Sequence, residues 1–257
     1  MNMPPWTLMD PPPGDDTRDP GTVATGLPPC DWPLPLGQAR VALRALRMED
    51  AGAFLDYRSD PEVARFQGWS AMDASTACEF IKTMEGVTGP RAGAWIQLGI
   101  VLCESDRLIG DIGLRLGDDG KAAQIGYSCA PGFQRQGLTT EAVGVLIDAL
   151  VRFTACETVH ALVDPRNTAS CRLLLRLCFR QVEPAGDAPG SSDIEELAYE
   201  LDLGDRSSFM RRQNAGDHCR SDPRPPIANR PRAGSATHRR NRVARTPARA
   251  MHRRWTG

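Results

Sequence analysis

Apolar residues recur at spacings of three and four in one stretch near the middle of the chain. They are Ala142, Val143, Leu146, Ile147, Leu150 and Val151, and this period predicts one buried face of a helix. Residues 123–130, shortly before, have the composition of a strand that stops at Pro131, which offers no amide to a ladder. The pattern therefore predicts a strand that runs through a glycine-bearing loop, residues 132–137, into a helix.

The same reasoning predicts the other elements. Strands are expected at residues 40–46, 94–103, 108–116, 123–130, 158–163, 179–182 and 195–203. Helices are expected at residues 47–58, 60–63, 73–84, 142–151 and 168–177. Asp60, Asp73 and Asn167 are the expected caps of the helices at 60–63, 73–84 and 168–177. This order predicts an α/β fold in which helices flank a central mixed sheet of about seven strands.

The two ends of the chain differ from the middle in composition. Residues 1–36 hold ten prolines and are expected to be disordered, which leaves one domain at 37–204. Residues 1–204 carry 17 Lys and Arg against 29 Asp and Glu, a net charge of −12. Residues 205–257 carry 14 arginines against three acidic residues, a net charge of +11. This tail is expected to be disordered, either as a solvated extension or as an arm that binds nucleic acid.

The cysteines bear on the compartment. There are eight, at positions 30, 78, 103, 129, 156, 171, 178 and 219, with no CxxC pair among them. They indicate reduced thiols in a cytoplasmic protein. A metal site from Cys156, His160 and Cys171 is conceivable, but the spacings match no familiar zinc pattern, so we expect no metal. No apolar run approaches the roughly 18 residues of a membrane span, so no membrane partner is expected.

The loop before the central helix has the chemistry of an anion site. Backbone amides at a helix start lack partners and add to the positive end of the helix dipole. The glycines at 132 and 137 with Thr139 have the spacing of a nucleotide-binding P-loop, but Leu138 stands where that loop needs lysine. Nucleotide hydrolysis is therefore disfavoured, while an ordinary strand–helix connection remains an alternative.

Gln134, Arg135, Gln136, Gly137 and Leu138 resemble the coenzyme A pyrophosphate loop of the GNAT acetyltransferases, whose pattern is Gln/Arg-x-x-Gly-x-Gly/Ala. Thr139 departs from the small last residue. Three longer stretches resemble the branch that includes ribosomal-protein N-terminal and aminoglycoside acetyltransferases. The resemblance implies a GNAT-like, largely antiparallel sheet, acetyl-CoA as co-substrate and a primary amine as acceptor. The stretches are 43–46 with 60–66, 125–142, and 163–179.

The resemblance also implies the site. Pantetheine should lie beside the strand at 127–130, and Ser170 should be the catalytic group that protonates the leaving sulfur. The residues expected to bind the cofactor are Tyr127, Ser128, Cys129, Ala130, Gln134, Arg135, Gln136, Gly137, Leu138, Thr139, Thr140, Asn167 and Ser170. From residue type alone, Asn167 could be only a helix cap and Ser170 only a small residue of the first turn.

Two further positions depart from the family pattern. Many of its members have a tyrosine acid where this chain has Leu174, which cannot donate a proton. The glycine expected after the helix is Cys178, and a non-glycine residue in a left-handed cap costs roughly 1–2 kcal/mol. Ser170, one turn before Leu174 on the same helix face, is the nearest hydroxyl that could substitute.

Other side chains have competing interpretations. Cys129 with His160 could form an acyl-enzyme pair, and His160 could be a base, although a structural role is the commoner one on a strand. Glu141 is expected to support the helix start, and Trp69 and Trp95 to line the core or a pocket. The alternative function is a non-catalytic module that binds acyl-CoA or nucleic acid. The chain is expected to be a monomer or homodimer, and its acidic body favours cationic amines.

Overall fold

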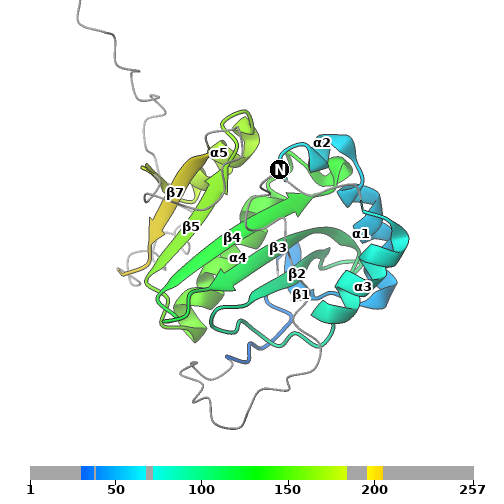
Figure 1. Cartoon of the computed structure of the whole chain (residues 1–257), viewed down its shortest axis with the longest axis horizontal. Coiled ribbons are helices and arrows are strands. Elements are labelled where there is room, and N and C mark those ends of the chain that lie inside the picture. The colour runs from blue at the N-terminus through cyan, green and yellow to red at the C-terminus, as the bar shows by residue number, and fades with distance from the viewer. Residues whose placement is uncertain (1–29, 38, 68–71, 184–195, 205–257) are drawn as a thin grey trace, which may run out of the picture. The chain divides into compact units, whose positions relative to one another are not determined.

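Seven strands form one sheet in the computed structural model, which describes residues 30–37, 39–67, 72–183 and 196–204. The order is β1-β2-β3-β4-β5-β7-β6 (Figure 1). Neighbouring strands in this described sheet are antiparallel except β4 and β5, which confirms the mixed, largely antiparallel prediction. The strands are β1 (Val41–Ala45), β2 (Trp95–Leu102), β3 (Leu108–Leu116), β4 (Ala122–Cys129), β5 (Thr158–Val163), β6 (Arg180–Val182) and β7 (Leu197–Asp202).

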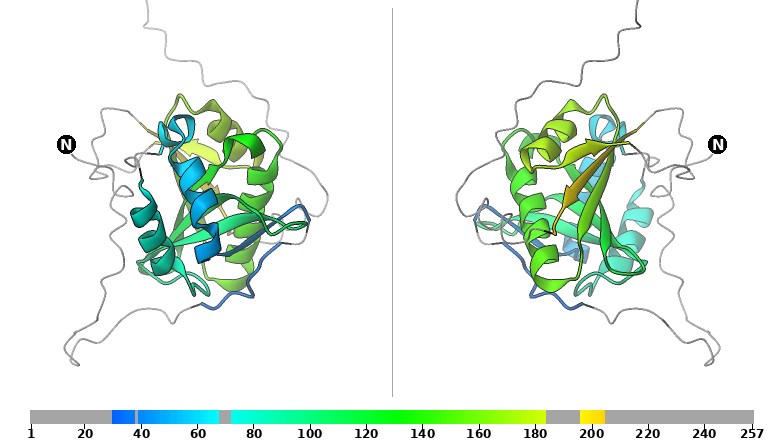
Figure 2. Two further views of the ribbon diagram at one scale, coloured as in Figure 1. Left: turned by 90° about the vertical axis from the view of Figure 1, so that its right-hand side faces the viewer. Right: turned by 90° about the vertical axis from the view of Figure 1, so that its left-hand side faces the viewer.

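Helices cover both faces of the sheet. Figure 2 shows α1 and α3 on one face and α4 on the other. The side chains of Asp60, Asp73 and Asn167 each accept a hydrogen bond from a backbone amide of the following helix, so all three predicted caps are confirmed. The helices are α1 (Ala51–Arg58), α2 (Pro61–Ala64), α3 (Ala74–Met84), α4 (Leu138–Phe153) and α5 (Thr168–Arg176), with short 3-10 turns η1 (Met48–Asp50) and η2 (Pro131–Phe133).

β4 and β5 pair over only part of their length. Their partners run from Ala122 with Thr158 to Gln124 with His160. β4 continues for five more residues and β5 for three, and Figure 1 shows the two strands diverging toward α2 and α5. Gly126 is exposed in this part of β4, which pairs with β3 but not with β5. A Cβ built on Gly126 would have no atom within 4 Å. The divergence therefore opens a gap in the middle of the sheet.

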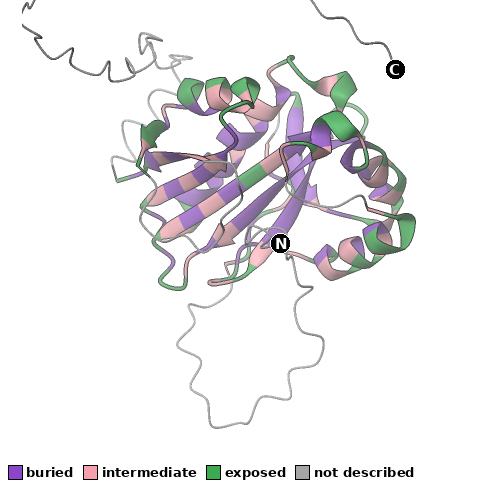
Figure 3. Cartoon of the chain, turned by 45° about the horizontal axis from the view of Figure 1, so that its top comes forward, coloured by how far each residue is buried: buried purple, intermediate pink, exposed green. Residues whose placement is uncertain are grey.

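Alternation along the strands divides the apolar residues between two clusters. On β1, Val41 and Leu43 join the larger cluster, which includes Leu146 of α4. Ala42 between them joins the smaller cluster, which includes Phe54 of α1. Successive strand residues point to opposite faces, so the sheet has a core on each side. Figure 3 shows buried residues concentrated along the central strands and exposed residues on the outer helix surfaces.

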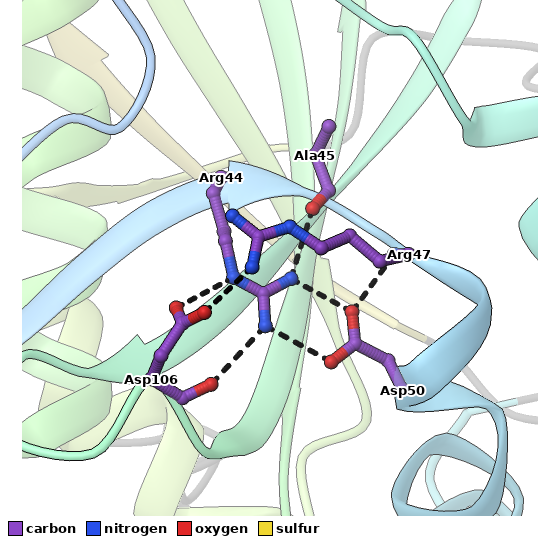
Figure 4. Close-up of polar contacts among 5 residues, drawn as sticks. All are labelled: Arg44, Ala45, Arg47, Asp50 and Asp106. Atoms are coloured by element: carbon purple, nitrogen blue, oxygen red, sulfur yellow. Dashed lines mark hydrogen bonds and ion pairs between the residues drawn. The ribbon is translucent and has the colours of Figure 1, made fainter.

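A buried charge network holds the start of the fold together (Figure 4). Arg44 of β1 donates to both carboxylate oxygens of Asp50, at 2.7 and 2.9 Å. Its Nε donates to Asp106, in the turn between β2 and β3, at 2.8 Å. The hydrogen bond from Arg44 lowers the pKa of Asp106. Because each buried charge is paired and hydrogen-bonded, the network locks the hairpin turn to β1.

Residues 30–36 correct the predicted domain boundary. They lie in the segment expected to be disordered, yet Trp32 is 5% exposed and belongs to the larger core cluster. The Trp32 amide donates to the Thr88 carbonyl at 2.7 Å, and Leu36 exchanges two backbone hydrogen bonds with Leu43. The apolar side chains between the prolines bury enough surface to offset the cost of ordering. The ordered domain therefore extends at least to Cys30.

Some predictions fall outside the described residues. The chain divides into two units, residues 1–220 and 221–257, and every described residue lies in the first. The predictions of disorder for residues 1–29 and 205–257, the nucleic-acid arm and the role of Trp69 all concern residues that the structure does not describe. Within the described ranges, no helix is long and apolar enough to cross a membrane.

Candidate active site

A cavity of about 470 Å³ lies where β4 and β5 separate. Its walls come from α2, the end of β4, the loop before α4, the first turn of α4, and α5. These elements are far apart in the sequence and meet because the strands diverge there. The cavity therefore joins the predicted phosphate loop to the start of the last helix.

Most of the predicted binding residues line this cavity. Those that do are Tyr127, Ser128, Cys129, Gln134, Arg135, Gly137, Thr139, Thr140, Asn167 and Ser170. Ala130, Gln136 and Leu138 are not among its lining residues. The Leu138 side chain is buried in the core, and the Gln136 side chain donates to the Gly132 carbonyl at 2.9 Å. Only their backbone groups are therefore available to a ligand in the loop.

The loop backbone takes the shape that an anion site needs. Arg135 has a φ of 60° and Gly137 a φ of 76°, both left-handed, and α4 begins at the next residue. Left-handed residues among right-handed ones turn successive amides toward one concavity. The amides of Leu138, Thr139 and Thr140 lie in the first turn of α4, where no preceding turn supplies them with helix partners. The loop and the helix start thus direct free amides and the helix dipole to one place.

Arg40 and Glu141 form an ion pair that contacts this loop, and sequence reasoning did not predict it. The Glu141 carboxylate accepts from the Arg40 backbone amide at 2.8 Å and from the Val41 amide at 3.3 Å. The Arg40 guanidinium binds the same carboxylate and donates to the Gln136 carbonyl at 3.1 Å. Glu141 was expected to support the helix start and does lie in the first turn of α4. Glu141 also binds the first amide of β1 and, through Arg40, connects this strand to the loop.

Two glutamines occupy the edge of β4 that faces the cavity. The Gln67 side-chain amide donates to the Tyr127 carbonyl at 3.1 Å. The Gln134 side-chain amide donates to the Cys129 carbonyl at 3.0 Å. Pairing with β5 has already ended at Gln124, so these amides supply the donors that a neighbouring strand would provide. This edge of β4 can therefore accept hydrogen bonds from an amide-bearing molecule in the cavity.

A tight turn presents the first residues of α5 to the cavity. The Asp164 carboxylate accepts from the Arg166 backbone amide at 2.8 Å and from its guanidinium. The guanidinium bond lowers the pKa of Asp164. Asn167 accepts from the Ser170 amide at 3.1 Å, so its carbonyl oxygen is used as a cap. Asn167 and Ser170 both line the cavity, where the side-chain nitrogen of Asn167 and the hydroxyl of Ser170 can contact a ligand.

Tyr127 and Ser170 face each other across the cavity wall. Their hydroxyl oxygens are 2.7 Å apart, and either can be the donor. Burial raises the pKa of Tyr127, and the hydrogen bond with Ser170 partly opposes this effect. Leu174, at the position where related enzymes carry a tyrosine, is fully buried in the core. A tyrosine hydroxyl is therefore present, but it comes from β4 instead of α5.

Several arginine side chains line the cavity. Arg65 pairs with Glu62 at 3.0 Å. Arg135, Arg172 and Arg176 also line the cavity, and none of the three makes an ion pair or side-chain hydrogen bond within the described residues. Arg172 and Arg176 lie four apart on α5 and thus on one helix face. Three guanidiniums around one cavity, none paired with a described residue, suit a ligand with several phosphates.

The geometry argues against the acyl-enzyme alternative. Burial raises the pKa of the Cys129 thiol, which reduces the thiolate that a nucleophile needs. His160 pairs with Gln124 across the parallel strands, five residues from Cys129 and so roughly 16 Å away along β4. Its ring contacts Thr158 and Glu200 instead. Among the described residues no group of three potential ligands could hold a metal ion.

α5 ends in a left-handed cap, with cysteine in the position where the family pattern has glycine. Cys178 has a φ of 67°. The Phe179 amide donates to the Leu174 carbonyl at 3.0 Å, and the Cys178 amide to the Leu175 carbonyl at 3.1 Å. These two bonds define a Schellman motif, which usually has glycine at the left-handed residue. The helix keeps the motif in spite of the strain at Cys178.

Comparison with known sequences shows the family of this chain. Residues 40–180 match the family model of the acetyltransferase (GNAT) domain. The uncharacterised N-acetyltransferase p20 of Bacillus licheniformis is 31% identical over 144 residues, which cover 55% of this chain and 80% of p20. The uncharacterised N-acetyltransferase YoaA of Bacillus subtilis is 30% identical over 144 residues, with the same coverage.

Solved structures share the fold. RimJ of Mycobacterium smegmatis, in complex with a coenzyme A disulfide, has a TM-score of 0.56 with this structure and 20% sequence identity. The match covers 72% of this chain and 96% of RimJ. Likeness at this level of identity speaks for the fold alone. The overall fold of this chain is thus found in other proteins.

Proposed function

Because this chain belongs to the GNAT family of acetyltransferases, as the loop at 134–139 predicted, we propose that it transfers an acetyl group from acetyl-CoA directly to a primary amine. One observation carries the proposal beyond the family name. The 470 Å³ cavity connects the free amides before α4 with the hydroxyl of Ser170 and so offers room for a phosphate-bearing, extended thioester. The reaction needs no prosthetic group, because the acetyl group arrives already activated.

The proposed donor position follows from the chemistry of the walls. The pyrophosphate would bind the amides of residues 135–140, where the helix dipole and Arg135 favour negative charge. The pantetheine arm carries amides of its own and would lie along β4, where the carbonyls of Tyr127 and Cys129 accept hydrogen bonds. The thioester would then reach Ser170. Gln67 and Gln134 would share or give up these carbonyls as the donor enters.

The proposed chemistry is a single displacement at the thioester carbonyl. The amine attacks as its neutral form, the carbon–sulfur bond breaks and the sulfur leaves with the electron pair. The protein then has to orient the two substrates, support the oxyanion and protonate the sulfur. Ser170 is the hydroxyl at the cavity that we assign to the sulfur. No covalent acyl-enzyme is involved, in agreement with the raised pKa of Cys129.

We assign cationic amines as the acceptor class, with a protein N-terminus, an aminoglycoside and a polyamine as the candidates. Residues 1–204 carry a net charge of −12, which attracts positively charged molecules to the domain. The relatives p20 and YoaA are named as N-acetyltransferases, which agrees with nitrogen as the acceptor atom. Both lines of support leave the three candidates equal.

A thiol-release screen tests the proposal. The full chain is mixed with acetyl-CoA and a panel of polyamines, aminoglycosides and peptides with free N-termini, and free coenzyme A is followed over time. The proposed enzyme releases thiol with at least one class and forms the matching N-acetyl product. A protein that binds acetyl-CoA without turnover for any amine would instead be the non-catalytic acyl-CoA module.

Donor binding can be tested separately at the loop. Gly137→Glu places a negative charge beside the expected pyrophosphate, and acetyl-CoA affinity should fall by at least tenfold. Gly137→Ala is the matched control, since it carries the same left-handed strain without charge. A folded Gly137→Glu variant that binds acetyl-CoA as tightly as Gly137→Ala would remove the loop from the donor site.

A further inference from the structure

We propose that Tyr127 supplies, through the Ser170 hydroxyl, the proton that the departing thiolate takes up. The phenol of Tyr127 would thus replace the tyrosine that is missing at position 174. This inference rests on the proposed function and names a second residue for its proton-transfer step. The sequence analysis predicted Tyr127 only as a cofactor-binding residue on the strand beside the donor, with no part in proton transfer.

The positions of the two hydroxyls support this role. Tyr127 lies on the part of β4 that pairs with β3 but no longer with β5, and Ser170 lies in the first turn of α5, 43 residues later in the chain. Their oxygens are 2.7 Å apart, and both residues line the cavity. Asn167 holds the Ser170 amide, so the serine backbone is fixed at the cavity wall. If Tyr127 donates to Ser170, the serine proton is free to point toward the sulfur.

Acidity decides which hydroxyl is the source of the proton. An alkyl hydroxyl is about as weak an acid as water, with a pKa near roughly 16, whereas a thiol such as that of coenzyme A has a pKa of about 8.5. A serine acting alone would therefore donate against a gradient of roughly seven powers of ten. A phenol, with an ordinary pKa of about 10, is the much stronger acid. Burial raises the pKa of Tyr127, so the phenol is fully protonated at neutral pH and its advantage over serine as an acid is smaller than that of an exposed phenol.

The proposed step balances. The amine nitrogen forms a bond to the acetyl carbon, the carbon–sulfur bond breaks, and the electron pair goes to sulfur. Ser170 gives its proton to sulfur as it takes the proton of Tyr127, so the serine ends as it began. Solvent returns to the tyrosinate the proton that the acetylated nitrogen loses. The products are the N-acetylated amine and coenzyme A thiol, with no oxidation or reduction.

The first measurement removes only the phenol oxygen. Tyr127→Phe should lower kcat by about 10², the lower end of the usual range for general acid catalysis, and leave KM for acetyl-CoA within about twofold. Tyr57→Phe is the matched control, because it makes the same change at a buried tyrosine of α1 outside the cavity. Its kcat should stay within about twofold of wild type. Thermal unfolding of both variants shows whether each is folded.

Two further readouts separate proton supply from a merely structural contact. Ser170→Ala should also lower kcat by about 10², and the double variant with Tyr127→Phe should be no slower than either single variant, because both interrupt one relay. The selenium analogue of acetyl-CoA has a leaving group that needs less help from a proton. It should restore most of the lost rate in Tyr127→Phe, whereas a structural defect would slow both donors equally.

The outcomes distinguish this inference from the function on which it rests. A wild-type protein that releases no thiol with any amine overturns the proposed function, and the inference with it. An active wild-type protein whose Tyr127→Phe variant keeps its kcat overturns the inference alone. So does a double variant in which the two losses multiply, or a selenium donor that is slowed as much as acetyl-CoA.

Discussion

The carboxylate of Glu141 holds Arg40 twice, through its backbone amide at 2.8 Å and through its guanidinium Nε at 2.8 Å. The two residues are 101 positions apart and join the start of β1 to the first turn of α4. The Arg40 side chain also donates to the Gln136 carbonyl, so one arginine connects the strand, the helix and the loop. The shape of the loop thus depends on a residue outside the loop motif.

We expect Glu141→Gln to weaken donor binding more than catalysis. The variant loses the charge that holds Arg40, and the Gln136 carbonyl becomes less firmly placed. KM for acetyl-CoA should rise roughly 5- to 10-fold, equivalent to about 1 kcal/mol, with kcat nearly constant. Glu157→Gln, which breaks the exposed pair with Lys121, serves as the control and should change neither parameter. An unchanged KM in Glu141→Gln would show that the loop holds its shape without Arg40.

Arg172 and Arg176 of α5 line the cavity without an ion pair to any described residue, and they predict recognition of the 3′-phosphate of coenzyme A. Changing Arg172 and Arg176 together to glutamine should reduce affinity for coenzyme A by about tenfold or more and leave affinity for 3′-dephospho-coenzyme A unchanged. The wild-type preference for coenzyme A should shrink as salt rises. Arg180→Gln is the control, because Arg180 is exposed on β6 and does not line the cavity. Equal binding of both ligands by the wild type would contradict the assignment.

The left-handed backbone at Cys178 carries a strain that two substitutions can measure. Glycine adopts a φ of 67° without the steric cost that a Cβ brings, so Cys178→Gly should be more stable than Cys178→Ala by about 1 kcal/mol. Both variants lose the sulfur and its packing, and their difference therefore isolates the strain. Chemical denaturation measures the free energy of unfolding of each. Alanine equal to glycine would mean that the helix end relaxes away from the left-handed cap.

We expect the segment around Trp32 to be needed for the full stability of the domain. A chain of residues 30–204 should unfold at a temperature close to that of the full protein. A chain of residues 37–204 loses Trp32 from the core and should be less stable by roughly 3–5 kcal/mol, the usual cost of emptying a buried tryptophan site. Thermal denaturation of the two chains compares them. Equal stability would show that Trp32 covers the core without supporting it.

Local signals in the sequence predicted local structure well. Asp73 and Asn167 are capping residue types directly before an apolar period, and each caps its helix as expected. The position of the α5 end was also predictable, whereas the left-handed conformation of Cys178 was not, because cysteine is strained in that conformation. These features depend on neighbours within a few positions, which the sequence shows directly.

Contacts between distant segments were not predictable in this way. The pair of Tyr127 with Ser170 arises because β4 and β5 separate beyond Gln124, and no residue type signals where a parallel pair will end. Ordering of the N-terminal segment was missed for a related reason. Its prolines argue for disorder, whereas the single side chain of Trp32 finds a place in the core that only the assembled fold provides.

The early end of the β4–β5 pairing leaves the sheet as two panels joined by a short seam. β1 to β4 form one panel and β5 to β7 the other, and three residue pairs of backbone connect them. A pantetheine arm along β4 would fill the space where β4 no longer pairs with β5 and would connect the two panels there. Rigidity would then depend on the supply of acetyl-CoA, since a ligand at 100 times its Kd adds about 2.7 kcal/mol to the folded state. The substrate would thus serve as a removable part of the architecture, and its departure would loosen the protein at the place where the next molecule has to enter.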